Sequence, residues 1–262
     1  MTAPRWRVAG SSVTGPRHAR AAEACQDRHL VRVSSSEALI AVVSDGAGSA
    51  RLGGEGAALV CEAVTQRLHH WAAASADRCS RATLVAACRA VRDGVAAARA
   101  TAAERAAAAS GTLDDYHATL VGALMLPGKG GVLCHIGDGA AVAIGGGGER
   151  WTLSAPENGE YADTTYFFTG EDWRRRLRFS LVGPDHDTVF VMSDGVTDVA
   201  LTHEGGRPRP FMPFFAPIAR FLDGADRVAG EEALAATLDS PAIRERIDED
   251  KTLVWASLGA SA

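Results

Sequence analysis

The stretch ALIAVVSDGAG, residues 38–48, is an apolar run with several β-branched residues that stops at a Ser-Asp-Gly triplet. A second stretch, TVFVMSDGVTD over residues 188–198, has the same form. Short apolar runs bounded by turn residues are typical of buried strands. Each stretch therefore places one carboxylate at the end of a predicted strand, Asp45 in the first and Asp194 in the second. A carboxylate held rigidly in this way can bind a hard cation.

The composition is that of an ordinary globular chain that can bury a sizeable core. Of its 262 residues, 47% are hydrophobic and 23% are charged, and the formal net charge is −5. This acidic balance argues against a nucleic-acid binder that depends on phosphate contacts. The five cysteines are odd in number and lack CxxC spacing, which argues against a disulfide framework or a zinc site.

The first residues lack the apolar segment of a signal peptide, and no apolar run approaches the ~20 residues of a membrane span. Together with the unpaired cysteine count, this predicts a cytoplasmic protein without a membrane partner.

The predicted elements run in the order strands, helices, strands, helices and a final strand. Apolar segments indicate strands over 6–9, 30–33, 38–44, 118–126, 132–136, 140–144, 151–153, 177–181, 188–193 and 252–258. Helical spacing begins at Glu55, and the Ala-rich residues 81–109 favour a helix. Residues 196–246 are predicted to be helical with Gly and Pro interruptions. Because regular βαβ alternation is missing, the order favours an α+β fold with antiparallel sheets over a doubly wound fold.

Two segments have a less regular pattern. The closely spaced strands of residues 118–153, joined by Gly turns, are expected to form one antiparallel meander. Residues 155–176 are polar and aromatic without a clear period, which predicts a long loop or flap. Its aromatic part, residues 161–169, is interpreted either as a cover over a cleft or as a strand packed on the core.

Acidic residues recur at predicted strand ends and turns far apart in the chain. They are Asp27, Asp45, Asp138, Asp194 and Asp250. A single Asp-Gly pair is most often only a turn. Several carboxylates from distant segments, however, can hold a pair of divalent cations that lower the pKa of a shared water and polarise a phosphoryl oxygen.

The acidic residues lie in five motifs, namely QD at 26–27, SDGAGSARLGGEGA at 44–57, HIGDGAAV at 135–142, VMSDGVTD at 191–198 and DEDKTLV at 248–254. The order of these motifs resembles the metal-dependent protein phosphatases of type 2C, the PPM family, and especially its bacterial members. The motifs extend over most of the chain. The glycine-rich block after Asp45 is the most specific of them.

The resemblance implies a four-layer α-β-β-α sandwich, with two antiparallel sheets flanked by helices. Residues 1–262 would form one catalytic domain, and residues 155–176 would be a flap loop within it. The activity implied is that of a serine/threonine protein phosphatase, in which a metal-bridging hydroxide attacks phosphoserine or phosphothreonine. The cofactors implied are Mn²⁺ or Mg²⁺, with two ions at the core site and a third near Asp138.

The resemblance also implies roles for individual metal ligands. Asp45 would bridge both metals, and the Gly46 carbonyl would help to hold one of them. Asp194 and Asp250 would complete the site, and Asp138 would contribute to the third metal. The family motif Asp-Asn-x-Thr can be aligned in two ways at the last position, so Glu249 is an alternative to Asp250.

Catalytic roles are assigned to two further residues. Asp27 would orient metal-bound water, and His18 would contact phosphate or act as a general acid. The family's phosphate-binding arginine has no firm counterpart, and Arg17 and Arg20 are candidates for it.

The expected partner is a phosphorylated protein substrate, with a Ser/Thr kinase acting in opposition and no nucleic acid or membrane involved. A monomer is expected. Because GDGA replaces the family's frequent GDSR at residues 137–140, a second hypothesis is a pseudophosphatase that acts as a binding or regulatory module.

Overall fold

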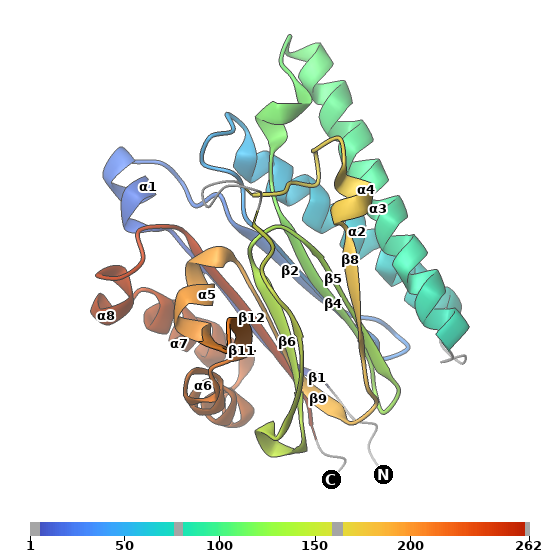
Figure 1. Cartoon of the computed structure of the whole chain (residues 1–262), viewed down its shortest axis with the longest axis vertical. Helices are drawn as coiled ribbons and strands as arrows, with labels where there is room; N and C mark the ends of the chain where they lie inside the picture. Colours follow the sequence, from blue (N-terminus) through green and yellow to red (C-terminus); the bar gives the residue numbers. More distant parts are fainter. Residues whose placement is uncertain (1–5, 76–80, 159–164, 260–262) are drawn as a thin grey trace.

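Two five-stranded sheets lie face to face in the computed structural model of the chain, and helices cover both outer faces (Figure 1). The structure describes residues 6–75, 81–158 and 165–259. All strand pairs within these ranges are antiparallel. This confirms the predicted α+β class and the four-layer α-β-β-α sandwich.

The first sheet has the strand order β2-β3-β4-β5-β8 and is covered by two long helices, α2 (Gly53–Ser75) and α3 (Arg81–Ala108). Its strands are β2 (Arg28–Val33), β3 (Leu39–Ser44), β4 (Leu120–Leu126), β5 (Gly130–Ile136) and β8 (Arg178–Val182). The two helices pack closely because Gly94 has no side chain: an added Cβ there would lie 2.7 Å from the Cα atom of Val64.

The second sheet has the strand order β1-β12-β9-β6-β7. Its strands are β1 (Trp6–Val13), β12 (Lys251–Leu258), β9 (His186–Met192), β6 (Ala140–Gly145) and β7 (Arg150–Ser154). It is covered by α5 (Asp194–Ala200), α6 (Met212–Gly224) and α7 (Arg227–Leu238). Within the described ranges, no helix is long and apolar enough to cross a membrane.

The remaining elements are short. They are α1 (Pro16–Ala21), α4 (Trp173–Arg176), α8 (Pro241–Arg244), the hairpin strands β10 (Leu201–Glu204) and β11 (Arg207–Pro210), and the 3₁₀ turns η1 (Leu113–Tyr116) and η2 (Gly146–Gly148). The predicted helical character of residues 196–246 is therefore wrong for 201–210. Gly205 and Gly206, with φ of +58° and +75°, form the turn of a hairpin there.

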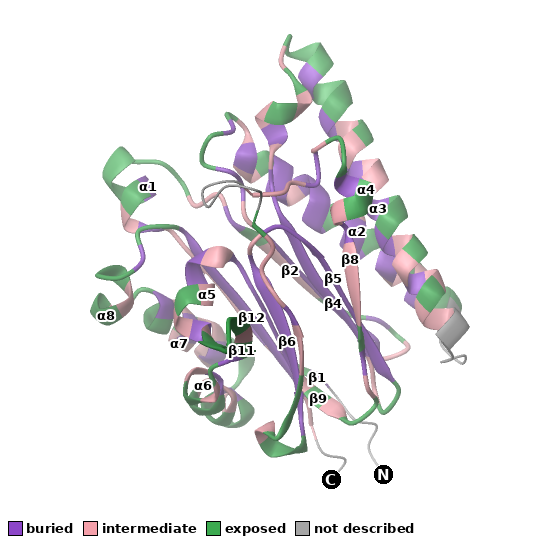
Figure 2. Cartoon of the chain, viewed as in Figure 1, coloured by how far each residue is buried: buried purple, intermediate pink, exposed green. Residues whose placement is uncertain are grey.

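The central strands are buried on both faces of the sheets, as the purple colour of β4 and β5 shows (Figure 2). In β3, all six residues are buried. Leu39, Ala41 and Val43 face the other sheet, whereas Ile40 and Val42 pack under the covering helices. Side chains alternate between the two faces of a strand, so a strand inside a four-layer sandwich has to be apolar throughout. This is the continuous apolar run seen in the sequence.

The predicted meander over residues 118–153 is wrong. Strands β4 and β5 pair in the first sheet, but β6 pairs with β7 and β9 in the second sheet. The chain therefore crosses between the sheets at Gly137-Asp138-Gly139. Gly137 has φ of +112°, and a Cβ on Gly139 would lie 2.6 Å from the Met192 carbonyl oxygen. The glycines thus allow a tight crossing rather than a hairpin turn.

One buried histidine bridges the two sheets. His135 of β5 is fully buried, and its Nδ1 lies 3.0 Å from the Oγ of Ser154 in β7. Burial, helped by the charge of Arg178, lowers the pKa of His135 to about 3.

This histidine gives the first prediction. Below pH ~6.5, the unfolded chain binds a proton at His135 that the folded chain does not bind, so the free energy of unfolding falls by about 1.4 kcal/mol per pH unit. Between about pH 6.5 and pH 5, the free energy of unfolding, measured with urea, should therefore decrease by about 2 kcal/mol less in His135→Asn than in the parent protein. The exposed His203→Asn is the control. Equal pH dependence in all three proteins would contradict the prediction.

Candidate metal centre

Asp45 follows the last residue of β3 and is fixed by backbone hydrogen bonds to the start of β4. The Asp45 carbonyl accepts a hydrogen bond from the Thr119 amide at 2.9 Å, and the Asp45 amide donates to Thr119 Oγ1 at 3.0 Å. Ser44 Oγ donates to the Thr119 carbonyl at 2.6 Å. These bonds hold the carboxylate at the end of the first sheet.

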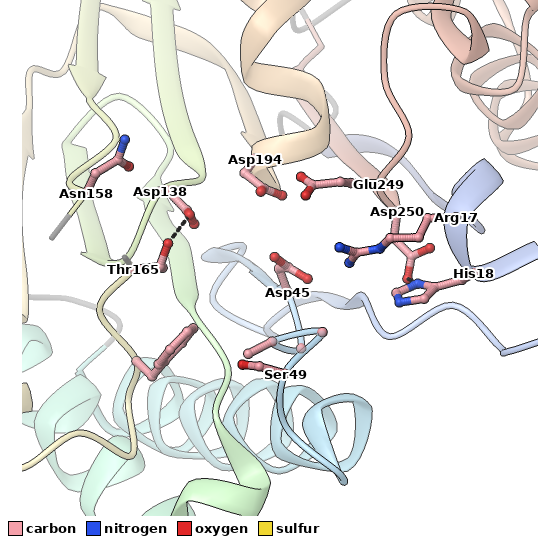
Figure 3. A pocket seen from close by; sticks show the side chains of 14 residues that line it. Arg17, His18, Asp45, Ser49, Asp138, Asn158, Thr165, Asp194, Glu249 and Asp250 are labelled. Carbon is pink, nitrogen blue, oxygen red and sulfur yellow. Dashed lines mark hydrogen bonds and ion pairs between the residues drawn. The ribbon is translucent and has the colours of Figure 1, made fainter. Parts of the chain in front are cut away.

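Two further aspartates reach the same place from the second sheet (Figure 3). Asp138 lies in the crossing between β5 and β6, and Asp194 is the first residue of α5, directly after β9. Asp45, Asp138 and Asp194 each offer a carboxylate oxygen, and these oxygens all lie within 4.8 Å of one another. We call these three residues the acidic cluster.

The acidic cluster is electrostatically strained. Burial raises the pKa of Asp45 well above its usual value, and the charges of Asp27, Asp194 and Asp138 raise it further. Burial also raises the pKa of Asp194, with the charges of Asp138 and Glu249 adding to the effect. Carboxylates brought out of water next to one another favour either a proton or a cation.

Donor atoms in the cluster fit a hard divalent cation. Oδ1 of Asp138 is buried and lacks a hydrogen-bond partner among the described residues, while Thr165 donates to its Oδ2. Oxygen-only ligand sets suit Mg²⁺ and Mn²⁺. The cluster could therefore hold metal.

Asp27 lies beneath the cluster rather than at its surface. Its side chain is 1% exposed, and its Oδ2 accepts a hydrogen bond from Ser193 Oγ at 2.7 Å. Burial raises its pKa, although contacts with Asp45 and Ser193 oppose this. Its Oδ1 is buried without a partner in the described part of the chain. Asp27 thus carries one free oxygen next to the site.

The two acidic residues before β12 point in different directions. The Glu249 carboxylate lies beside Asp194 and lines the same cavity (Figure 3). Asp250 instead accepts hydrogen bonds from the Gly15 amide on Oδ1 at 2.7 Å and from the Gln26 amide on Oδ2 at 2.6 Å. The geometry thus favours the alternative, Glu249, over Asp250 as the last ligand.

The charge state of Asp250 supports this distinction. Burial disfavours its ionisation, but the amides of Gly15 and Gln26 and the imidazole of His18 together hold its pKa below the usual value. Asp45 and Asp194 have raised pKa values because they face carboxylates. Protein donors thus stabilise the ionised form of Asp250, whereas acidic neighbours destabilise the ionised forms of Asp45 and Asp194.

The N-terminal candidates separate in the structure. Arg17 and His18 line the cavity that contains the acidic cluster, and His18 Nδ1 lies 2.9 Å from Oδ2 of Asp250. Arg20 is exposed and forms an ion pair with Asp248 at 2.6 Å. Of the two arginine candidates, only Arg17 is therefore placed to meet a bound phosphate.

The cavity around the cluster has a volume of about 590 Å³. It is lined by residues of the predicted flap, namely Asn158, Thr165 and Phe167, and by Gly46 and Ser49. Phe167 stacks on His117 with ring centroids 4.7 Å apart. Residues 159–164 lie outside the described residues, so only the ends of the predicted flap can be placed.

Sequence reasoning missed the lining residues Asn158, Thr165 and Ser49. Ser49 lies inside the motif at 44–57 but carries no charge that marks it as a ligand, whereas Asn158 and Thr165 lie in the flap segment, which has no clear period. Glu249 could have been preferred by its place three residues before Thr252 in the Asp-Asn-x-Thr motif, but the Glu side chain made the match less obvious.

Comparisons with known proteins agree with this geometry. The family model of protein phosphatase 2C matches residues 14–239. Serine/threonine-protein phosphatase 3 of Escherichia coli is 33% identical over 259 residues, which cover 96% of this chain and 98% of that protein.

Solved structures share the fold at low sequence identity. A bacterial serine phosphatase has a TM-score of 0.65 at 14% identity, with 98% of this chain and 100% of that chain covered. The serine/threonine phosphatase Stp1 from Staphylococcus aureus has a TM-score of 0.63 at 14% identity, with 97% and 95% covered. At this identity, the likeness supports the fold alone.

The strain in the acidic cluster gives a second prediction. Asp45→Asn removes one of the repelling charges, so we expect it to stabilise the metal-free protein by about 1–2 kcal/mol, or about 2–4 °C in Tm per kcal/mol. The variant should also lose the Tm increase that Mn²⁺ gives the parent protein. Thermal unfolding with EDTA and with Mn²⁺ measures both effects. The exposed Asp198→Asn is the control, and a lower Tm of Asp45→Asn in EDTA would contradict the repulsion argument.

Proposed function

This chain belongs to the protein phosphatase 2C family, and on that premise we propose that it hydrolyses phosphoserine and phosphothreonine in proteins with the help of Mn²⁺ or Mg²⁺. The observation that carries the proposal is the acidic cluster, whose three carboxylate oxygens converge within 4.8 Å. Among the described residues, none of the three carboxylates forms an ion pair with a basic side chain, and their neighbours are acidic. A buried group of like charges is costly unless a cation is its intended partner.

Four carboxylates are proposed to hold the metals. Asp45, Asp194 and Glu249 would hold two ions, with the Gly46 carbonyl as a further ligand, and Asp138 would contribute to a third ion. Two such cations, when bound, would lower the pKa of a shared water and neutralise charge on the phosphoryl group. Asp250, the ligand expected from the sequence, is replaced by Glu249 in this proposal.

The other residues would act on the water, the phosphate and the leaving group. The free Oδ1 of Asp27 could orient the attacking water. Arg17 could bind two phosphoryl oxygens with its planar guanidinium. His18 could donate a proton to the departing serine or threonine oxygen, which is too basic to leave without one. The flap ends, with Asn158 and Phe167, would contact the substrate chain.

Further statements about the molecule in its cell stay predictions. They are opposition to a Ser/Thr kinase, the monomeric state, the cytoplasmic location and the absence of nucleic-acid or membrane partners. The single domain over residues 1–262, with a flap at 155–176, is likewise proposed. The pseudophosphatase hypothesis gains no specific support, because the acidic cluster is complete and its oxygens converge.

A test of the ligand set compares two aspartates of one helix. Asp194 lies in the acidic cluster, whereas Asp198 is exposed one turn further along α5. Asp194→Asn should reduce Mn²⁺-dependent hydrolysis of an aryl phosphate and of phosphoserine and phosphothreonine peptides by roughly 10³-fold, because several kcal/mol of transition-state stabilisation are lost. Asp198→Asn should stay near the parent. Full activity in Asp194→Asn would refute the site, and inactivity of the parent with Mn²⁺ and Mg²⁺ would favour the binding module.

A test of phosphate binding uses the two arginines of α1. Arg17→Ala should raise KM for phosphopeptides by roughly tenfold, because a charge-assisted contact contributes about 1.5–3 kcal/mol, while Mn²⁺ affinity stays unchanged. Arg20→Ala is the matched control, since its side chain pairs with Asp248 at the surface. If both variants change KM equally, general charge rather than a specific contact is responsible.

A further inference from the structure

The carboxylate of Asp250 joins two points that are far apart in one loop. Its Oδ1 accepts a 2.7 Å hydrogen bond from the Gly15 amide, and its Oδ2 accepts a 2.6 Å hydrogen bond from the Gln26 amide. Strand β1 ends at Val13, and β2 begins at Arg28. Residues 15–26 therefore form a loop whose two ends meet on a single side chain. We call these residues the N-terminal loop.

The N-terminal loop lies tightly against the segment before β12. A Cβ on Gly15 would lie 2.2 Å from the Glu249 carbonyl carbon, so only glycine allows this approach. The Arg17 amide donates to the Asp248 carbonyl at 3.0 Å. The loop is thus fixed by contacts from three consecutive residues, and Asp250 provides the buried ones.

The N-terminal loop carries two side chains that face the acidic cluster. Arg17 and His18 both lie in the N-terminal loop and line the cavity of the acidic cluster (Figure 3). His18 Nδ1 lies 2.9 Å from Asp250 Oδ2, and both side chains are almost fully buried, at 7% and 3% exposed. One carboxylate therefore contacts both ends of the loop and the imidazole inside it.

The occupancy of its oxygens argues against a direct role in metal binding. Both oxygens already accept short, charge-assisted bonds from backbone amides. A cation on either oxygen would have to share that oxygen with an amide donor, and loss of the amide bond would leave a buried N–H group without a partner, which is costly. Asp250 also lines the cavity, but Glu249 is the one whose carboxylate lies beside Asp194.

We propose that Asp250 is a positioning residue: its carboxylate closes the N-terminal loop at Gly15 and Gln26 and holds His18 and Arg17 at the acidic cluster. The inference rests on the proposed phosphatase function for the roles of His18 and Arg17. The closure of the loop itself rests only on the observed contacts. Two kinds of measurement, one without substrate and one with it, therefore separate the two ideas.

The substrate-free experiment uses the full chain with Asp250→Asn and Glu249→Gln, and with the exposed Asp198→Asn, which lies outside the loop and its contacts, as control. Mn²⁺ affinity is measured by calorimetry, and amide hydrogen exchange is followed by NMR. Asp250→Asn should keep Mn²⁺ affinity within about threefold of the parent while the Gly15 and Gln26 amides exchange roughly tenfold faster or more. Glu249→Gln should lower Mn²⁺ affinity by roughly tenfold or more and leave those amides protected.

The substrate experiment measures kcat and KM separately for a phosphopeptide. Misplacement of the loop should lower kcat/KM of Asp250→Asn by roughly 10²-fold, whereas Asp198→Asn stays near the parent. The double variant Asp250→Asn/His18→Gln should lose no more kcat/KM than the more affected single variant, because both changes remove the same contribution, that of a correctly placed His18. If Asp250→Asn does not fold, Asp250→Glu keeps the charge, moves the carboxylate by one methylene, and should give the same pattern.

Each other result has a definite meaning. Loss of Mn²⁺ affinity in Asp250→Asn as large as in Glu249→Gln would make Asp250 a ligand and overturn the inference. Unchanged exchange of Gly15 and Gln26, or losses fully additive with His18→Gln, would also overturn it. A parent protein without phosphatase activity would instead refute the proposed function, and the exchange data would still decide whether Asp250 closes the loop.

Discussion

Mutual repulsion of buried carboxylates is the constraint on which the functional end of this protein depends. Asp45, Asp138 and Asp194 present oxygens within 4.8 Å of one another, and burial and neighbouring charge raise the pKa of all three. Water would normally screen such charges, but here each aspartate is only partly accessible. The fold therefore has to hold the carboxylates in place against a force that separates them. A bound divalent cation would offset the repulsion between the carboxylates, and this relief would add to the affinity for the cation.

The fold meets this constraint by fixing the backbone of each aspartate. Asp45 is held by hydrogen bonds from its amide to Thr119 Oγ1 and from the Thr119 amide to its carbonyl, just before β4, and Asp138 sits in a crossing that only glycines allow. Asp194 begins a helix directly after a strand, so its position is set by two elements at once. Apolar layers on both faces of each sheet anchor these segments. Rigid support of this kind is what a preorganised metal site requires.

The sequence predicted those parts of the fold in which a residue pattern is compatible with only one local structure. The apolar runs before Asp45 and Asp194 predicted two buried strands and the placement of both carboxylates at their ends, because a strand buried on both faces must be apolar throughout. The pattern could not tell which sheet the strand after Asp138 joins, since β6 is equally apolar in either place. The sequence pattern also could not place Asn158, Thr165 and Phe167. They lie between β7 of one sheet and β8 of the other, in a segment without a clear period, and they line the cavity.

Glu249 and Asp250 show why residue type alone does not assign a role to a carboxylate. The two are adjacent and chemically similar, yet one faces acidic neighbours in an open cavity and the other faces two backbone amides. A carboxylate without donors around it keeps all its lone pairs for a cation, whereas one that accepts N–H bonds on both oxygens already stabilises the protein's own structure. Successive side chains at the entry to a strand point to opposite sides, so a single step along the chain exchanges these environments. The position at the start of β12 thus separates two adjacent carboxylates, and Glu249, the one beside Asp194, is the ligand that we propose.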